Sequence, residues 1–385
     1  MKSLIHNGIH RKAIAALFLC VIFMLSLSAC GGTDTGSTQE EAAAEPSSLM
    51  TTVAPSAKQE PEESVPPAAA EADESTDAPS TAEETVEDMD APSVAAGERA
   101  EEKSIYTDAN GDTAYIPAEF MVSAKADEQT IGNGLVIIGP GGSEFVWVPT
   151  TVTALEVREF GSYFSGGSIS DYYDETELES YQEMVASVEK YGGFYIGRYE
   201  ASKGAEGLPA SKRVTEDEPG QIWVQFSPQD TTIVCEKLYA DNDTVQGFFP
   251  WGINWDTTLQ WLVDSGNKLI SDIKADSTSW GNYSNDSFSD GARGNYTGAW
   301  EEAKANNIYD LAGNNWEWTQ ERCGSNYVMR SGGYNLMGGA CPGSRYPAAI
   351  RDPLPGNNHH PNVCFRVALF LVVENTSTGI TPVTM

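Results

Sequence analysis

Two adjacent histidines and one cysteine are the residues of the mature chain whose types come nearest to a catalytic set. His359 and His360 precede Pro361, and Cys341 lies in the same region. A serine or cysteine nucleophile would need one of these histidines, because histidine is the usual general base near neutral pH. The chain has no nucleophile elbow, phosphate-binding loop or HExxH helix. Two histidines without a spaced third ligand make a weak metal site, so a solvated loop is the favoured interpretation.

Two stretches have the periodicity of helices that could position such residues. Apolar residues over 178–188 recur on one face, which predicts a helix that Gly192 ends. Asp256 is expected to be the N-cap of a second helix over 257–265, which Gly266 ends. These two are the main helices that the sequence predicts.

Short strands with abundant glycine between them fill much of the remaining chain. Strands are predicted at 144–148, 193–200, 316–319 and 362–371, where β-branched and aromatic residues cluster or alternate with polar ones. Few helices, many short strands and long connections indicate a loop-rich α+β domain over residues 105–375.

The N-terminal residues predict export and lipid attachment. Basic residues precede an apolar run over 13–27, which is shorter than the roughly 20 residues needed to cross a bilayer. Residues 27–30, LSAC, resemble a bacterial lipobox, in which Cys30 is acylated after removal of the signal peptide, residues 1–29. The alternative is an ordinary cleaved signal with a chance cysteine. We expect a lipid-anchored protein on the extracytoplasmic side of a cell membrane.

Residues 30–104 have the composition of a disordered stalk. Residues 31–102 contain 19 Asp and Glu against two basic residues, and no aromatic residue occurs between Phe23 and Tyr106. Such a segment buries too little apolar surface to offset the entropy of ordering it. Its acidity, within a net charge of −33, argues against nucleic-acid binding. Residues 376–385 are predicted to be a flexible tail.

The order of motifs in the folded region resembles the formylglycine-generating enzyme, or sulfatase-modifying factor, domain family. The segments that carry the resemblance are FVWVP at 145–149, GGFYIGRYEASKG at 192–204, PWGINWDTTLQWL at 250–262, IYDLAGNNWEWT at 308–319, VMRSGGY at 328–334 and NVCFRVAL at 362–369. The resemblance implies a large variant of the C-type lectin fold. It does not by itself imply an activity, because one fold hosts many functions.

The cysteines argue against the chemistry of that family. Its enzyme uses two cysteines after the Gly-Gly strand to hold copper and activate oxygen, and two thiolates suit Cu(I). The matching positions here are Leu336 and Cys341, so Cys341 is the one remaining catalytic candidate and copper is not expected. Cys341 and Cys364 could form a shifted pair, but a disulfide is favoured in an exported domain. With Cys235 and Cys323, three pairings are open.

The same resemblance implies a calcium site in the loop before the Trp-Glu-Trp strand. The matching residues are Asp310, Gly313, Asn315 and Glu317. Their side-chain and carbonyl oxygens suit Ca²⁺, which takes six to eight oxygen ligands. Strand alternation is expected to direct Glu317 away from the core that Trp316 and Trp318 enter. The alternative is that the acidic side chains only cap the turn through backbone amides.

The segment from Tyr334 to His360 is predicted to form a contact surface of loops. Aromatic, arginine and asparagine side chains provide stacking, forked hydrogen bonds and adaptable amides. The residues expected on this surface are Tyr334, Asn335, Arg345, Tyr346, Arg351, Asn357, Asn358, His359 and His360. The alternative for Arg345, Arg351 and Arg366 is a structural role, bridging carboxylates and loop carbonyls, and for Arg366 this alternative is favoured.

These observations predict a non-catalytic, surface-displayed, ligand-binding lipoprotein. Related domains serve as the variable display proteins of diversity-generating retroelements, in which this same segment varies. The expected partner is an extracellular protein or a glycan, besides the membrane that holds the lipid of Cys30. The alternative is a sulfatase-modifying-factor-like oxidoreductase, or another enzyme, that uses Cys341. A purely structural envelope protein would lack a concave polar patch near Tyr334.

Overall fold

The computed structural model describes most of the chain after the acidic segment. The described residues are 91–155, 162–163, 179–284, 294–336, 338, 346–357 and 359–374. The predicted signal peptide, Cys30 and the tail lie outside them, as do Cys341, Arg345 and Asn358. In the described part of the chain, no helix has the length and apolar character needed to span a membrane.

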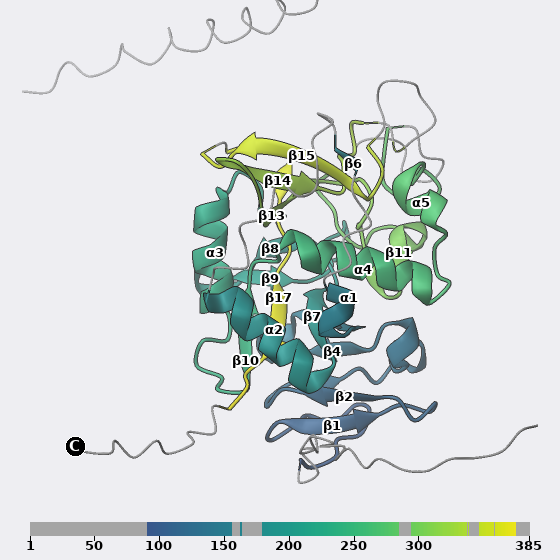
Figure 1. The fold of residues 1–385 in the computed structure, drawn as a ribbon, viewed down its shortest axis with the longest axis vertical. Coiled ribbons are helices and arrows are strands. Elements are labelled where there is room, and N and C mark those ends of the chain that lie inside the picture. The colour runs from purple at the N-terminus through teal and green to yellow at the C-terminus, as the bar shows by residue number, and fades with distance from the viewer. Residues whose placement is uncertain are drawn as a thin grey trace, which may run out of the picture. The chain divides into compact units, whose positions relative to one another are not determined.

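A six-stranded antiparallel sheet forms the centre of the fold, in the order β10-β17-β7-β5-β4-β3 (Figure 1). Its strands are β3 (Met121–Val122), β4 (Val136–Ile138), β5 (Glu144–Pro149), β7 (Gly193–Gly197), β10 (Val245–Phe248) and β17 (Ala368–Leu371). The last described strand, β17, therefore lies between β10 and β7. This places residues just before β17 next to residues just after β7.

Both faces of this sheet are buried. Trp147 and Tyr195 pack on one face, whereas Val146 and Ile196 pack on the other, as the period of two along a strand requires. Because both faces are covered, β5 and β7 are almost continuously apolar. The strand predicted at 144–148 is confirmed.

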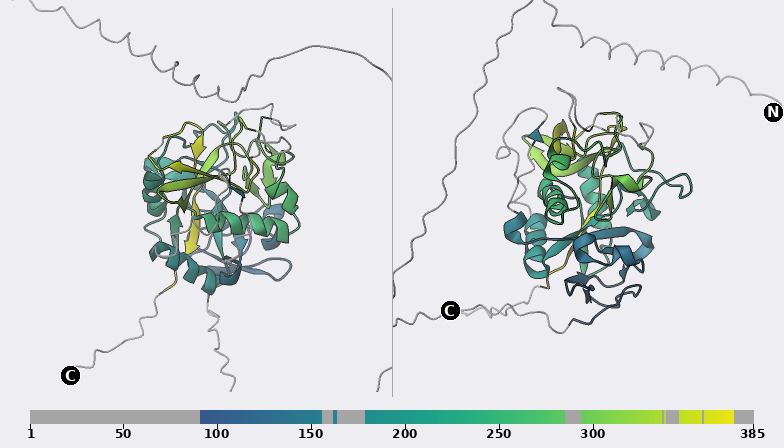
Figure 2. Two further views of the ribbon diagram at one scale, coloured as in Figure 1. Left: turned by 45° about the horizontal axis from the view of Figure 1, so that its top comes forward. Right: turned by 90° about the vertical axis from the view of Figure 1, so that its right-hand side faces the viewer.

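The described helices are α1 (Val152–Leu155), α2 (Glu179–Tyr191), α3 (Pro228–Lys237), α4 (Gly252–Asp264) and α5 (Ile270–Lys274). Helices α1, α2, α4 and α5 pack in the apolar cluster on the face of the sheet that carries Val146, whereas α3 contacts β10 and packs in the cluster of the opposite face. Helix α2 crosses β17 and β7, and α4 contacts β5 (Figures 1 and 2). The first predicted helix is confirmed: α2 buries Tyr181 and Val188 and ends before Gly192, whose φ is +77°.

The second predicted helix begins earlier than expected. Helix α4 starts at Gly252, where the Asn254 side chain accepts a hydrogen bond from the Trp251 backbone N–H. Asp256 is therefore inside the helix and is not its N-cap. Its side chain is fully buried in ion pairs with two arginines, and this long-range pairing overrides its local preference for a cap.

A second, five-stranded sheet has the order β16-β13-β14-β15-β6. Its strands are β6 (Ser162–Tyr163), β13 (Trp316–Cys323), β14 (Asn326–Arg330), β15 (Ile350–Pro355) and β16 (Val363–Cys364). Strand β16 runs parallel to β13, and β6 runs parallel to β15; the other pairs are antiparallel. The strand predicted at 362–371 is thus two strands, β16 and β17, in different sheets. Arg366 lies at the break between them.

Three strand pairs and several short 3-10 turns complete the described fold. The pairs are β1 (Ser104–Thr107) with β2 (Thr113–Ile116), β8 (Ala201–Lys203) with β9 (Pro209–Ser211), and β11 (Lys304–Ala305) with β12 (Ile308–Tyr309). Chain before residue 105 also packs onto the fold, because Ala100 is buried and exchanges backbone hydrogen bonds with Glu119 and Phe120. The mixed, loop-rich content confirms the α+β class.

Candidate functional site

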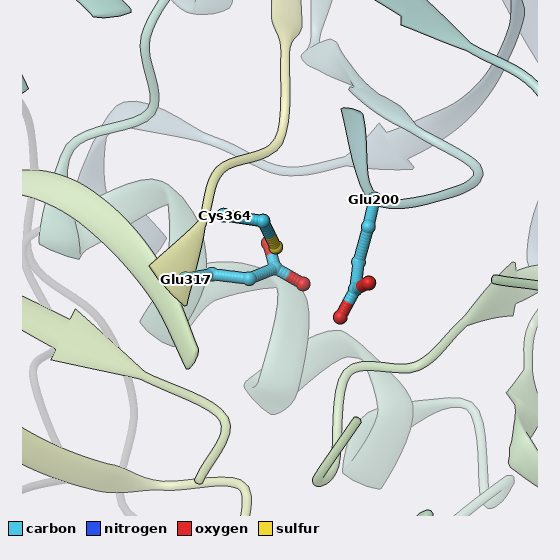
Figure 3. Close-up of side chains that lie close together, drawn as sticks. All are labelled: Glu200, Glu317 and Cys364. Carbon is cyan, nitrogen blue, oxygen red and sulfur yellow. The ribbon is translucent and has the colours of Figure 1, made fainter. Parts of the chain in front are cut away.

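Three fully buried carboxylates lie where the two sheets meet. Glu200 lies between β7 and β8, Asp310 follows β12, and Glu317 is the second residue of β13. The ligand atoms of Glu200, Glu317 and the thiol of Cys364 all lie within 4.8 Å of one another. In Figure 3 the carboxyl groups of Glu200 and Glu317 point towards each other, and the sulfur lies beside Glu317. We call Glu200, Asp310, Glu317 and Arg366 the acid-rich centre.

Arg366 is the cation of this centre. Its Nη2 and Nε donate to the two carboxylate oxygens of Glu317, at 2.7 and 3.1 Å. Its remaining donors reach the backbone carbonyls of Gly197 (2.8 Å) and Tyr309 (2.9 Å). Arg366 thus bridges a carboxylate and two loop carbonyls, which confirms the structural role favoured from the sequence.

Amide groups from the loop before β13 hold the Glu200 carboxylate. Asn315 donates to it from both its backbone N–H and its side chain, each at 2.9 Å, and the Asn314 side chain donates at 2.7 Å. The loop can turn this tightly because Gly313 has a φ of +71°, and a Cβ on it would lie 2.2 Å from the Asn282 carbonyl oxygen. The Gly-Asn-Asn sequence therefore builds a cradle for Glu200.

Asp310 is only half satisfied by the protein. Its Oδ2 accepts hydrogen bonds from Thr297 Oγ1 and the Gly298 backbone N–H, both at 2.8 Å. Among the described residues, its buried Oδ1 has no hydrogen-bond partner. A buried carboxylate oxygen without a partner is costly, so this atom is the one in the centre best placed to take a further cation or proton.

Charge in the centre is unbalanced, with three carboxylates around one guanidinium. Burial raises the pKa of Glu200 well above its ordinary value, and the neighbouring Asp310 and Glu317 raise it further. Burial also raises the pKa values of Asp310 and Glu317, although Arg366 opposes this change. The Cys364 thiol has a pKa raised well above its ordinary value by burial and by the two glutamates, so it is not a reactive thiolate.

The four residues expected to bind calcium differ in what their oxygens contact. Asp310 offers the partnerless Oδ1, whereas the Gly313 carbonyl accepts a bond from Ser331 Oγ at 2.7 Å. The Asn315 side chain is bound to Glu200, and Glu317 is paired with Arg366. Glu317 does point away from the Trp316 and Trp318 core, but it enters a second buried region. Excess negative charge and oxygen ligands fit a hard cation, which would share Glu317 with Arg366.

A pocket of about 250 Å³ lies over the acid-rich centre. Its lining residues are Gly220, Gln221, Ile222, Val224, Gly294, Asn295, Asn315, Tyr334, Pro361 and Asn362. Asn315 links pocket and centre, because its side chain bonds both Glu200 and the Gly294 carbonyl. Ile222, which lines the pocket, packs in one apolar cluster with Cys364. We call this cavity the Tyr334 pocket.

The Tyr334 pocket has one aromatic ring and a set of side-chain amides. Tyr334 is anchored by its backbone N–H, which donates to the Asn314 carbonyl at 2.6 Å, and by its hydroxyl, which donates to Asn362 Oδ1 at 3.3 Å. Gln221 and Asn295 add further amides. The sequence predicted Tyr334 as a contact residue but missed these amides, because they come from separate loops with no common motif.

The other predicted contact residues do not all share this surface. Asn335, Asn357, His359 and His360 are exposed, and His359 Nδ1 lies 3.1 Å from the Gln225 carbonyl oxygen. Tyr346 is half-buried with its ring edge-on to Trp316.

Arg351 is not on the surface, so its predicted exposure is wrong. It is fully buried, pairing through Nε with Glu321 at 2.7 Å and through Nη2 with Asp256. Arg330 pairs with the same two carboxylates, at 2.8 Å to Asp256 and 3.4 Å to Glu321. We call these four residues the balanced network. Arg351 therefore has the structural role, bridging carboxylates, that the sequence offered as the alternative.

The pairing of the cysteines also differs from expectation. Cys235, Cys323 and Cys364 are free thiols, so the disulfide expected between Cys341 and Cys364 is not formed. Leu336, where the enzyme family has its first cysteine, is half-buried against the core. The thiol of Cys364 lies among buried apolar and acidic side chains, where there is no partner cysteine among the described residues.

Comparison with known proteins does not assign this chain to a family. No family model matches the chain, and no curated protein matches it. The solved structure of CarF is similar with a TM-score of 0.29 and 14% identity, over 47% of this chain and 87% of that chain. Treponema denticola variable protein 1 is similar with a TM-score of 0.24 and 12% identity, over 69% and 98%. At these TM-scores neither similarity carries an argument about fold or function.

Proposed function

We propose that this chain is an exported, lipid-anchored protein whose C-type-lectin-like domain, of the formylglycine-generating-enzyme type, displays a ligand-binding pocket. The Tyr334 pocket is the observation that carries this proposal. A purely structural protein has no need of a polar cavity, whereas concave sites with a few convergent polar groups are typical of ligand binding. The pocket also contains a residue that the sequence selected for contact.

The chemistry of the pocket suits a glycan. Side-chain amides of Gln221, Asn295 and Asn362 can both donate to and accept from sugar hydroxyls, and Tyr334 presents a ring with a polar tip. Ile222 and Pro361 supply apolar surface between these groups. An extracellular protein is the other partner class expected from the sequence, and its binding would be an alternative outcome of the same test.

Calcium belongs to this proposal as a brace beneath the pocket. Asp310, Gly313, Asn315 and Glu317 would supply its ligands. The strongest support is Asp310 Oδ1, which has no hydrogen-bond partner in the part of the chain that the structure describes. A cation there would offset the excess charge behind Asn315 and so fix one wall of the Tyr334 pocket. Copper is no part of the proposal, because Leu336 stands where a thiolate would be needed.

The test is binding of the full chain, in detergent, to arrays of glycans and extracellular proteins. Tyr334→Ala and Asn362→Ala should each weaken the selected ligand by about tenfold or more, since removing a contact in a desolvated pocket typically costs over 1 kcal/mol. Asn110→Ala, an exposed amide outside the pocket and outside the predicted contact surface, is the matched control and should change little. Equal effects of Asn362→Ala and Asn110→Ala would refute the pocket as the binding site.

A further inference from the structure

A second pocket, of about 280 Å³, lies beside the Tyr334 pocket. Its lining residues are Arg213, Thr215, Glu216, Asp217, Glu218, Tyr296, Ala299 and Trp300. None of them was selected from the sequence, because their segments contain no recognised motif. We call this cavity the acidic–aromatic pocket.

The same two chain segments line both pockets. Residues 213–224 and 294–300 are joined by a pair of backbone hydrogen bonds between Val214 and Thr297, each at 3.0 Å. Tyr296 lines the acidic–aromatic pocket and packs in one apolar cluster with Ile222, which lines the Tyr334 pocket. An extended ligand that occupied one pocket would therefore have the other within reach along these segments.

The acidic side of this pocket is a closed turn. The Thr215 backbone N–H donates to the Glu218 carbonyl at 3.0 Å, and the Glu218 N–H donates to Thr215 Oγ1 at 3.1 Å. A Cβ on Gly220 would lie 2.9 Å from Val214 Cγ2, so glycine lets the turn fold back onto its base. The turn holds Glu216 and Asp217 at its tip, and the Tyr296 hydroxyl donates to Glu216 at 3.4 Å.

The pocket combines carboxylates with aromatic rings. It has three acidic residues against one basic residue, Arg213, whose guanidinium is 3.9 Å from Glu218. Tyr296 and Trp300 are half-buried, and ring faces attract cations, with tryptophan the strongest. Negative charge beside aromatic rings favours an organic ammonium as the ligand. An anionic group such as a carboxylate or a phosphate would be repelled by the acidic side chains.

We infer that the acidic–aromatic pocket binds the protonated amino group of an amino sugar, within a glycan whose neighbouring residue occupies the Tyr334 pocket. The inference rests on the proposed function and narrows its ligand class to glycans with unacetylated amino groups. The adjacent amides favour a sugar over a lysine side chain, because a lysine would leave the Tyr334 pocket without hydroxyl partners.

The experiment titrates the full chain, in mildly acidic low-salt buffer, with short glucosamine oligomers and with their N-acetylated counterparts. The charged oligomers should bind roughly tenfold more tightly, and added salt should shrink the difference as it screens the exposed carboxylates. The double variant Glu216→Gln, Asp217→Asn should lose this preference while keeping its affinity for the acetylated oligomer. The control is Asp241→Asn, Asp243→Asn, which removes the same charge from an exposed loop elsewhere.

The outcomes separate the two proposals. If charged and acetylated oligomers bind equally, or if both double variants behave alike, the amino-sugar inference is overturned. The Tyr334 pocket still stands in that case, provided that Tyr334→Ala weakens both oligomers. A lysine pentapeptide that binds more tightly than the glucosamine oligomer overturns the sugar assignment. Failure of both oligomers to bind also overturns the inference, whereas the proposed function is then decided by the array.

Discussion

Strand β13 contributes a glutamate to each of two buried polar centres that are built in opposite ways. Glu321 belongs to the balanced network, in which two arginines meet two carboxylates. Glu317 belongs to the acid-rich centre, in which one arginine serves three carboxylates. All eight side chains are essentially inaccessible to solvent. The difference lies in charge and not in burial.

The balance of charge distinguishes the balanced network, which is structural, from the acid-rich centre, which could bind a cation. In the balanced network every charge has an opposite neighbour, and Arg330 also bonds the Ile350 carbonyl at 2.9 Å. It ties α4 to β13, β14 and β15. In the acid-rich centre, an oxygen of Asp310 has no hydrogen-bond partner among the described residues, and the centre lies beneath a pocket. Perturbed carboxylates beside a cavity are typical of functional sites.

The largest expected effect comes from breaking the balanced network. Arg330→Met leaves Asp256 and Glu321 with one arginine between them, and breaking a buried ion pair costs about 3–5 kcal/mol. Urea unfolding should show this loss in the free energy of unfolding. Arg322→Met, on the same sheet but partly exposed, is the control. A similar loss of unfolding free energy in both variants would contradict a larger contribution from the buried network than from a partly exposed arginine.

The second effect is a pH dependence of stability to which the acid-rich centre should contribute. The pKa of Glu200 is raised in the folded state above its ordinary value of 4.5, so the folded protein holds this proton more tightly. The contribution of Glu200 to stability is therefore complete below about pH 4.5 and is lost as pH rises from there through the folded-state pKa. One proton gives a slope of at most about 1.4 kcal/mol per pH unit.

Urea unfolding at a series of pH values checks this slope. Glu200→Gln should make the slope shallower, whatever its absolute stability, because one of the three carboxyl groups with raised pKa values is removed. Glu206→Gln, an exposed glutamate, should leave the slope unchanged. Parallel curves for the two variants would contradict the assignment of the pH dependence to Glu200.

The smallest expected effect is stabilisation by calcium. At ten times its dissociation constant a bound ion adds about 1.4 kcal/mol, which thermal unfolding in millimolar Ca²⁺ against chelator would detect. Asp310→Asn should abolish the response, whereas Asp264→Asn, at the exposed end of α4, should retain it. An unchanged melting temperature in the wild type would leave the acid-rich centre without its proposed cation.

Local sequence signals predicted the elements well where one short-range rule decides. The stripe that includes Tyr181 and Val188 gave the α2 helix, and glycine ended it. Asp256 misled for the opposite reason: it has the local preference of a cap, but two arginines more than seventy residues away in sequence hold it inside α4. The strand predicted at 362–371 is two strands in different sheets. Arg366 lies in the break between them, where its side chain pairs with Glu317.

The candidate site was predicted only in part. Tyr334 was selected for its residue type, and the Gly-Asn-Asn loop for its motif, yet the amides of Gln221 and Asn295 belong to connections without a pattern. Glu200 lay within a quoted motif without an assigned role. Arg351 was placed on the contact surface because its partners, Asp256 in α4 and Glu321 in β13, are distant in sequence.

The sequence by itself determined periodicity, turns and composition, because these depend on residues a few positions apart. It predicted the α+β class, the helix over 178–188 and the turn at Gly313. Only the tertiary structure decided where charge is balanced and where it is not. That distinction depends on which strands become neighbours. Strand β16 beside β13 brings Arg366 to Glu317, and β15 beside β14 brings Arg351 to Arg330 and their shared carboxylates.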